Sequence, residues 1–158
     1  MLLAMRLLHI VLGVFWAGAL IFNALFLGPA IRDAGPEGGK VMAALLRRRF
    51  LDIMPVVAVL SIAAGIWLYW FQSGGFQPAY MRSRMGMTIG VGALAAVLAF
   101  GLGVGILRPA MLKAMKLSQD PAQLTAAQAL RARAVLMGRV VAVLLGLAVA
   151  AMAVARYM

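Results

Sequence analysis

The chain has 158 residues, of which 65% are hydrophobic, and its formal net charge is +11. Its mean hydropathy of +1.01 excludes an ordinary soluble domain. It has no cysteine, which excludes disulfides, thiolate metal sites, iron–sulfur clusters and covalently attached haem. The positive charges lie beside apolar segments, so they predict membrane topology and argue against nucleic-acid binding.

Apolar segments long enough to cross a bilayer as helices recur along the chain. The predicted spans are about 3–27, 53–71, 85–107 and 135–155. We therefore predict an all-α fold: an integral membrane four-helix bundle that forms one domain over 1–158, with helical extensions on the cytoplasmic side.

The first span carries the only histidine of the protein. His9, Trp16 and Asn23 follow one another at intervals of seven residues, so they share one stripe of a helix. This stripe favours protein contacts over lipid. His9 is either an imidazole ligand to haem iron or copper, or a histidine that hydrogen-bonds across the bundle. We expect Trp16 to pack in the core and Asn23 to donate a hydrogen bond between helices.

Gly28-Pro29 predicts a break or bend after the first span. Residues 37–51 are amphipathic and are expected at the membrane surface or as an extension of the second span. Pro55 predicts a kink or a fresh helix start there. A local ion pair with Arg47–Arg49 is expected for Asp52.

The third span is rich in glycine, and Arg108-Pro109 is predicted to end it. Two G-x-x-x-G pairs predict close helix contacts there: Gly86 with Gly90, and Gly101 with Gly105. Just before and within its start lie Met81, Met85 and Met87. Their thioethers are either soft ligands for Cu(I) or ordinary packing groups of a methionine-rich chain.

Asp120-Pro121 predicts the start of a polar helix that runs directly into the fourth span. Near the entrance of that span, Arg139 either extends to the surface or binds an anionic head group or a haem propionate. The segments 27–31 and 107–111 resemble each other, which is consistent with two similar helical hairpins in the same orientation.

The distribution of Lys and Arg predicts the orientation. The loops after the first and third spans carry Arg32, Lys40, Arg47, Arg48, Arg49, Arg108, Lys113, Lys116, Arg131 and Arg133. The opposite side carries only Arg6, Arg82, Arg84 and Arg156. The positive-inside rule then places the two long loops in the cytoplasm and both termini in the periplasm of a bacterial inner membrane.

The first half of the chain resembles small four-helix bacterial membrane proteins of the copper-resistance-D-like and membrane protoporphyrinogen-oxidase-like group. The likeness rests on Leu8-His9-Ile10 followed by Trp16-Ala17-Gly18, and continues through Phe26-Leu27-Gly28-Pro29, Val41-Met42, Arg48-Arg49, Met54-Pro55 and Gly65. The resemblance implies that His9 corresponds to the first-helix histidine that ligates haem or metal in that group. The lysine that the oxidase family carries in its third span has no counterpart between Arg84 and Arg108.

Two functions follow as hypotheses. The first is a protein that binds b-type haem or copper through His9. If the ligand is haem, the iron has a methionine as its second axial ligand, has no second axial ligand, or is bound by a second His9 across a homodimer. The second is a non-catalytic accessory subunit of a larger membrane complex, docked on lipid or protein. The candidate cofactor-binding residues are His9, Trp16, Asn23 and Arg139, and the candidate metal ligands are His9, Met81, Met85 and Met87. Whether the protein is an enzyme is left open.

Overall fold

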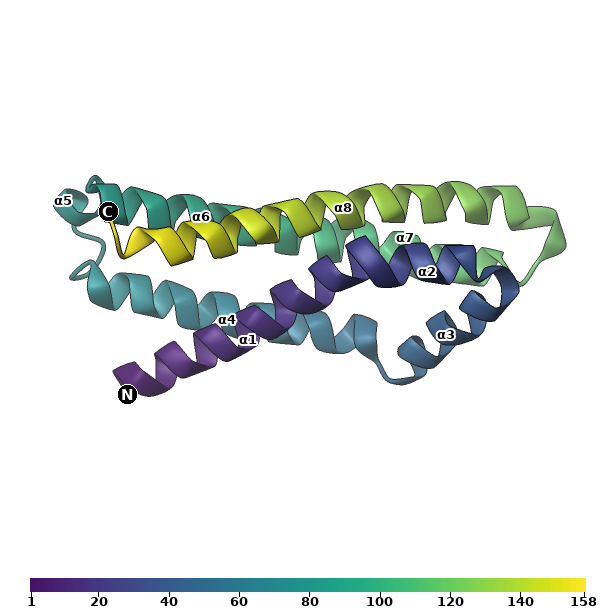
Figure 1. Ribbon diagram of the computed structural model, residues 1–158, viewed down its shortest axis with the longest axis horizontal. Coiled ribbons are helices and arrows are strands. Elements are labelled where there is room, and N and C mark those ends of the chain that lie inside the picture. The colour runs from purple at the N-terminus through teal and green to yellow at the C-terminus, as the bar shows by residue number, and fades with distance from the viewer.

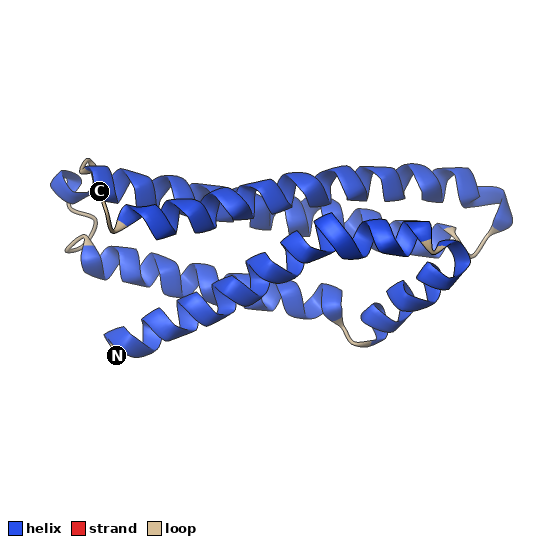
Figure 2. Ribbon diagram, in the orientation of Figure 1, coloured by secondary structure: helices blue, strands red, loops and turns tan.

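The computed structural model describes residues 1–158, apart from the side chain of Pro36. All regular elements in the described chain are helical (Figure 2). Four helical rods are long and apolar enough to cross a membrane: Leu2–Asp33, Phe50–Gln72, Arg84–Leu117 and Pro121–Ala155. The predicted all-α bundle with four apolar helices is confirmed.

The first hairpin consists of a long rod, a short polar helix and a second rod. The first rod joins α1 (Leu2–Phe22), the π-helical η1 (Asn23–Leu27) and α2 (Gly28–Asp33). After a single turn residue, α3 (Gly35–Arg47) folds back beside α2, and Gly38 touches the backbone of Ile31. The second rod is α4 (Phe50–Gln72).

The second hairpin also consists of two long rods, but its polar segment is continuous with the second rod. After the short α5 (Pro78–Met81), a long rod joins α6 (Arg84–Leu102), the π-helical η2 (Gly103–Leu107) and α7 (Arg108–Leu117). The turn that follows contains η3 (Pro121–Gln123) and leads into α8 (Leu124–Ala155). The predicted polar helix that continues into the fourth span is confirmed, since α8 is unbroken.

The bundle has two distinct ends. Both termini lie at one end together with α5, and we call it the terminal end (Figure 1). The opposite end carries α2, α3, α7 and the turns that precede α4 and α8, and we call it the loop end (Figure 1). Around the bundle, α1 packs on α4 and α8, and α6 packs on α8 and, less extensively, on α4.

Pro29 and Pro109 do not end their helices, so the predicted break and the predicted helix end are wrong. Each proline follows a π-helical segment and occupies the first turn of the next α-helix. The N–H of Gly28 bonds to the carbonyl of Asn23, five residues earlier. A proline ring normally clashes with the carbonyl four residues before it, and the wider π turn relieves that clash.

The two π-helical segments lie at matching places in the two hairpins. In the second, the N–H of Arg108 bonds to the carbonyl of Gly103. Each segment is five residues long and immediately precedes the Gly-Pro or Arg-Pro pair that suggested the repeat. The backbone therefore supports the two similar hairpins, beyond the short sequence likeness.

The junction between α3 and α4 differs from the expectation. Arg49 adopts a left-handed conformation with φ of 58°, which turns the chain sharply before α4 begins at Phe50. Pro55 consequently lies inside α4, and the predicted fresh start at that proline is wrong. The amphipathic segment is a separate helix against α2.

Of the two predicted G-x-x-x-G pairs, only Gly86 makes a close backbone approach, to Tyr80 and Met81 of α5, and neither pair forms the contact between α6 and α8. Gly101 and Gly105 face open space, whereas a Cβ on Gly92 would lie 3.0 Å from the Cβ of Ala151. Ala95 and Ala99 on α6 are also buried. Small residues without branched side chains let α6 and α8 approach, so the seam of this pair follows Gly92 and these alanines.

Candidate functional site

His9 is held directly against α4. Its Nδ1 lies 2.8 Å from the carbonyl oxygen of Ser61, and the Ser61 hydroxyl donates back to the carbonyl of His9 at 3.3 Å. Two glycines make this approach possible. A Cβ on Gly65 would lie 2.7 Å from Cε1 of His9, and one on Gly13 would lie 3.3 Å from Oγ of Ser61.

The hydrogen bond to Ser61 determines which imidazole nitrogen is free. A carbonyl oxygen only accepts, so Nδ1 of His9 must carry the proton in this bond. In the neutral imidazole, Nε2 then presents a lone pair. The side chain is half-buried. The predicted hydrogen bond of His9 to another helix is therefore present. The same tautomer, with the proton on Nδ1, leaves Nε2 free to bind a metal, as the ligand hypothesis requires.

The other residues of the stripe have different surroundings. Trp16 is only 5% exposed and packs in the central core with Met54, Ala58 and Leu145, as expected for a packing residue. Asn23 begins η1, where its backbone carbonyl accepts the Gly28 N–H. Among the described residues, the predicted side-chain hydrogen bond of Asn23 to another helix is not formed.

The three candidate methionine ligands lie at the start of the second hairpin. Met81 ends α5, while Met85 and Met87 lie in the first turns of α6. Met81 and Met87 are exposed, and the Sδ of Met85 is 3.9 Å from Nε2 of Gln72. His9 contacts Ser61 and Gly65 of α4, whereas Met85 contacts Gln72, seven residues farther along the same helix, so about 10 Å separates the two levels and they do not form one site. In the described chain, no three His, Asp or Glu residues form a metal-binding group.

An ion pair at the loop end joins the two hairpins. Asp52 Oδ1 lies 2.8 Å from a guanidinium nitrogen of Arg108, and the Arg108 Nε donates to the Leu51 carbonyl at 3.2 Å. Arg49 lies farther from Asp52, at 3.8 Å. The expected local pair is therefore secondary to a long-range one. The sequence analysis did not predict this role of Arg108. The only signal was that Arg108 occupies, in the segment 107–111, the position that Gly28 occupies in the similar segment 27–31.

Arg139 points away from the core. Its side chain is exposed on α8, next to Gly138, whose Cβ position is 4.0 Å from Leu107. It therefore lies at about the level of Arg108. Ser61, the partner of His9, is nine residues beyond Asp52 on α4, and a rise of about 1.5 Å per residue separates the two levels by about 13 Å. Arg139 is not assembled with His9 into one site.

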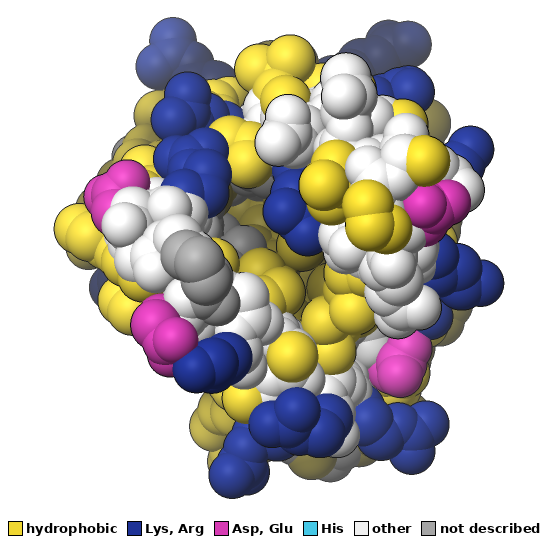
Figure 3. All heavy atoms as spheres, turned by 90° about the vertical axis from the view of Figure 1, so that its right-hand side faces the viewer, with side chains coloured by type: hydrophobic (Ala, Val, Ile, Leu, Met, Phe, Trp, Pro, Cys, Tyr) yellow, Lys and Arg dark blue, Asp and Glu magenta, His cyan; other side chains and the backbone are white. Residues whose placement is uncertain are grey.

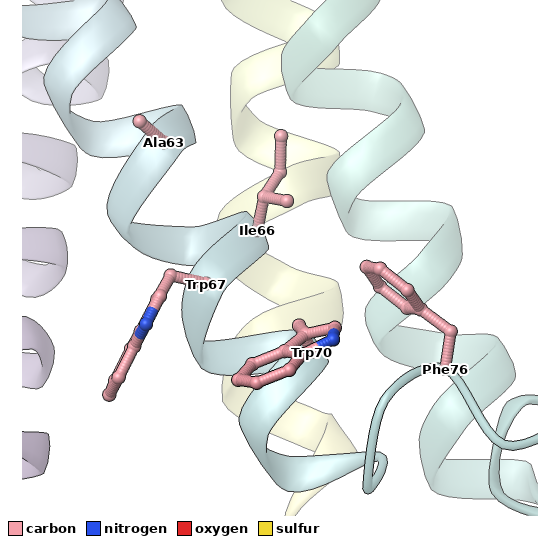
Figure 4. Close-up of a pocket in the computed structure, with 5 residues that line it drawn as sticks. All are labelled: Ala63, Ile66, Trp67, Trp70 and Phe76. Carbon is pink, nitrogen blue, oxygen red and sulfur yellow. The ribbon is translucent and has the colours of Figure 1, made fainter.

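Two apolar hollows lie on opposite halves of the bundle. The larger is an open groove of about 640 Å³ in the terminal half, and Figure 4 shows its lining residues from α4 and the following loop. They are Ala63, Ile66, Trp67, Trp70 and Phe76. The smaller is a cleft of about 50 Å³ in the other half, between α1, α4 and the α6–η2 rod.

The turn between α4 and α6 is closed by aromatic residues. The Tyr69 hydroxyl donates to the Gly86 carbonyl at 2.9 Å, and the rings of Tyr69 and Tyr80 meet edge to face. The hydroxyl of Tyr80 is buried without a hydrogen-bond partner among the described residues. Burial, with a smaller effect of Tyr69, raises the pKa of Tyr80 above its ordinary value. This cluster fixes the turn and contains no obvious ligand set.

The fold and composition define a small four-span membrane protein. No protein-family model, curated protein or solved structure matches the chain. The resemblance to the copper-resistance-D-like and protoporphyrinogen-oxidase-like group therefore rests on its motif residues alone.

Proposed function

We propose that this protein binds a b-type haem through Nε2 of His9. The observation that carries the proposal is the 2.8 Å hydrogen bond from Nδ1 to the Ser61 carbonyl. Histidines that ligate metals commonly donate their other ring N–H to a backbone carbonyl or a carboxylate, which fixes the ring and its tautomer. His9 has that arrangement within an apolar helix pair.

Haem fits the surroundings of His9 better than copper does. A single axial imidazole suffices for five-coordinate haem iron, whereas a copper site usually needs several protein ligands. The methionines that could complete a copper site lie on α5 and in the first turns of α6, whereas His9 is held against Ser61 and Gly65 of α4. A second His9 across a homodimer would supply a sixth iron ligand.

The surface of α1 on either side of His9 also suits a haem. Leu8 and Ile10 are exposed apolar side chains of the same helix. Arg6 is exposed and lies three residues before His9, so both are on the same side of α1 within one turn. When bound, haem would supply electron transfer or gas binding at its iron. The chain's residues would hold it by His9 and pair a propionate with Arg6.

The proposed orientation follows from charge. Most Lys and Arg residues lie at the loop end, and we place that end in the cytoplasm and the termini in the periplasm of a bacterial inner membrane. His9 would then lie in the outer half of the bilayer.

A second candidate function is that of an accessory subunit in a larger membrane complex. The observation that favours it is the open groove in the terminal half, where Trp70 is 48% exposed and Phe76 is 41% exposed. Trp70 and Phe76 lie beside the gap between α4 and α6 (Figure 4). Aromatic side chains in such a groove are suited to contact another helix.

The test is a visible spectrum of the protein purified in mild detergent after expression with haem precursor and copper supplied. We expect a Soret band that shifts on reduction with dithionite, and its loss in His9→Ala. Metal analysis of the same samples distinguishes copper. A protein that carries copper and no haem, or neither, contradicts the proposal, and a stable co-purifying membrane protein would support the accessory function.

A further inference from the structure

The loop half of the bundle contains an apolar cleft that the His9 site does not use. Trp16 contributes to it from α1, Ala58 from α4, and Ala99 and Gly103 from the α6–η2 rod. The small side chains of the last three residues leave the space open. No Cβ placed on Gly103 would meet another atom within 4 Å.

Charged residues lie at one edge of this cleft. Leu51 and Arg108 line it directly, and Arg108 is fixed by its bonds to the Leu51 carbonyl and to Asp52. Nε of Arg49 lies 3.8 Å from Oδ2, the other carboxylate oxygen of Asp52. Two guanidinium groups and one carboxylate leave a net charge of +1 beside an otherwise apolar space.

The loop end is hollowed in the middle when viewed along the bundle (Figure 3). Hydrophobic side chains form the floor of the hollow, and Lys and Arg side chains lie around it, with Asp and Glu side chains among them. A molecule that suits this combination has an aliphatic chain and an anionic head of one negative charge. In a membrane, such a molecule is a phospholipid with a monoanionic head group.

We infer that the cleft between α1, α4 and η2 holds one acyl chain of an anionic phospholipid, whose phosphate is bound by Arg108 and Arg49. The chain lies against Trp16 and the small residues, where it fills a gap that the protein itself leaves. The phosphate offsets the net positive charge at the edge of the cleft. Asp52 limits the strength of this interaction because it already pairs with both arginines.

Native mass spectrometry of the detergent-purified protein tests this inference. The probes are phosphatidylglycerol and phosphatidylcholine with identical acyl chains, supplied at equal concentration. We expect the wild type to retain one phosphatidylglycerol and to release phosphatidylcholine. Asp52→Asn removes the competing carboxylate, and one added unit of positive charge near a membrane surface strengthens retention by about fivefold. Arg108→Gln should weaken it.

Matched leucine variants test the role of the cleft. Gly103→Leu fills it and should abolish retention of the lipid. Gly101→Leu, on the same rod and also in open space but outside the cleft, should leave retention unchanged. Equal retention by the two leucine variants, equal retention of both lipids, or an unchanged value for Asp52→Asn overturns the inference. Displacement of the lipid by glycerol phosphate alone would also overturn it, because the head group would then suffice without a chain.

Discussion

Gly65→Ala is expected to displace the His9 ring and to weaken haem binding by about 10- to 100-fold, the usual effect of losing a partner that orients a metal-ligating histidine. The added methyl group would lie 2.7 Å from Cε1 and 2.9 Å from Nδ1 of His9. The ring can move because it is the end of a side chain, but its bond to the Ser61 carbonyl is then lost. Titration of the purified protein with haem, followed by the Soret band, measures the effect.

Gly18→Ala is the control for this prediction. It lies on the same helix as His9, and its added methyl group meets nothing within 4 Å. Haem affinity should therefore equal that of the wild type. If Gly65→Ala binds haem as tightly as Gly18→Ala does, the orientation of His9 by α4 has no part in binding.

Gly92→Leu is expected to destabilise the bundle by about 1–3 kcal/mol, the range typical of overpacked interiors. Its Cβ would already lie 3.0 Å from the Cβ of Ala151 and 3.3 Å from the Ala148 carbonyl. The longer leucine must therefore push α6 away from α8. The free energy of unfolding in detergent micelles, measured by denaturant titration, should fall accordingly.

Gly101→Leu gives the matched comparison for packing. It makes the same substitution on α6, where the side chain enters open space. We expect little change in unfolding free energy. Leucine has the higher helix propensity, so propensity alone would favour both variants, and equal destabilisation of the two would contradict the role of the α6–α8 seam.

The sequence predicted the elements whose signal is strong and local. Apolar runs of bilayer length gave the four helices, and the seven-residue interval placed His9 and Trp16 on one stripe. The likeness of 27–31 to 107–111 predicted two similar hairpins, but it gave no sign of the π-helical segment that precedes each proline. The proximity of Ser61 to His9 was not predictable, because a serine in an apolar span carries no signal of its partner.

The errors have a common physical origin. A break or bend was predicted at Gly28-Pro29 and a helix end at Arg108-Pro109, but a π turn accommodates each ring and lets the helix continue. The predicted local ion pair of Asp52 forms with Arg49 at 3.8 Å, but the nearer partner, Arg108 at 2.8 Å, comes from the other hairpin and was not predicted. Both outcomes depend on how the chain is arranged in three dimensions, and short-range patterns do not contain that information.

Rescue of a His9→Gly variant by free imidazole tests the central claim most directly. The variant removes the ligand but leaves room for imidazole beside Gly65 and Ser61. The proposal predicts that haem binding and its Soret band are lost in His9→Gly and return when imidazole is added. A His9→Gly protein that holds haem as the wild type does, without imidazole, would show that His9 is not the iron ligand.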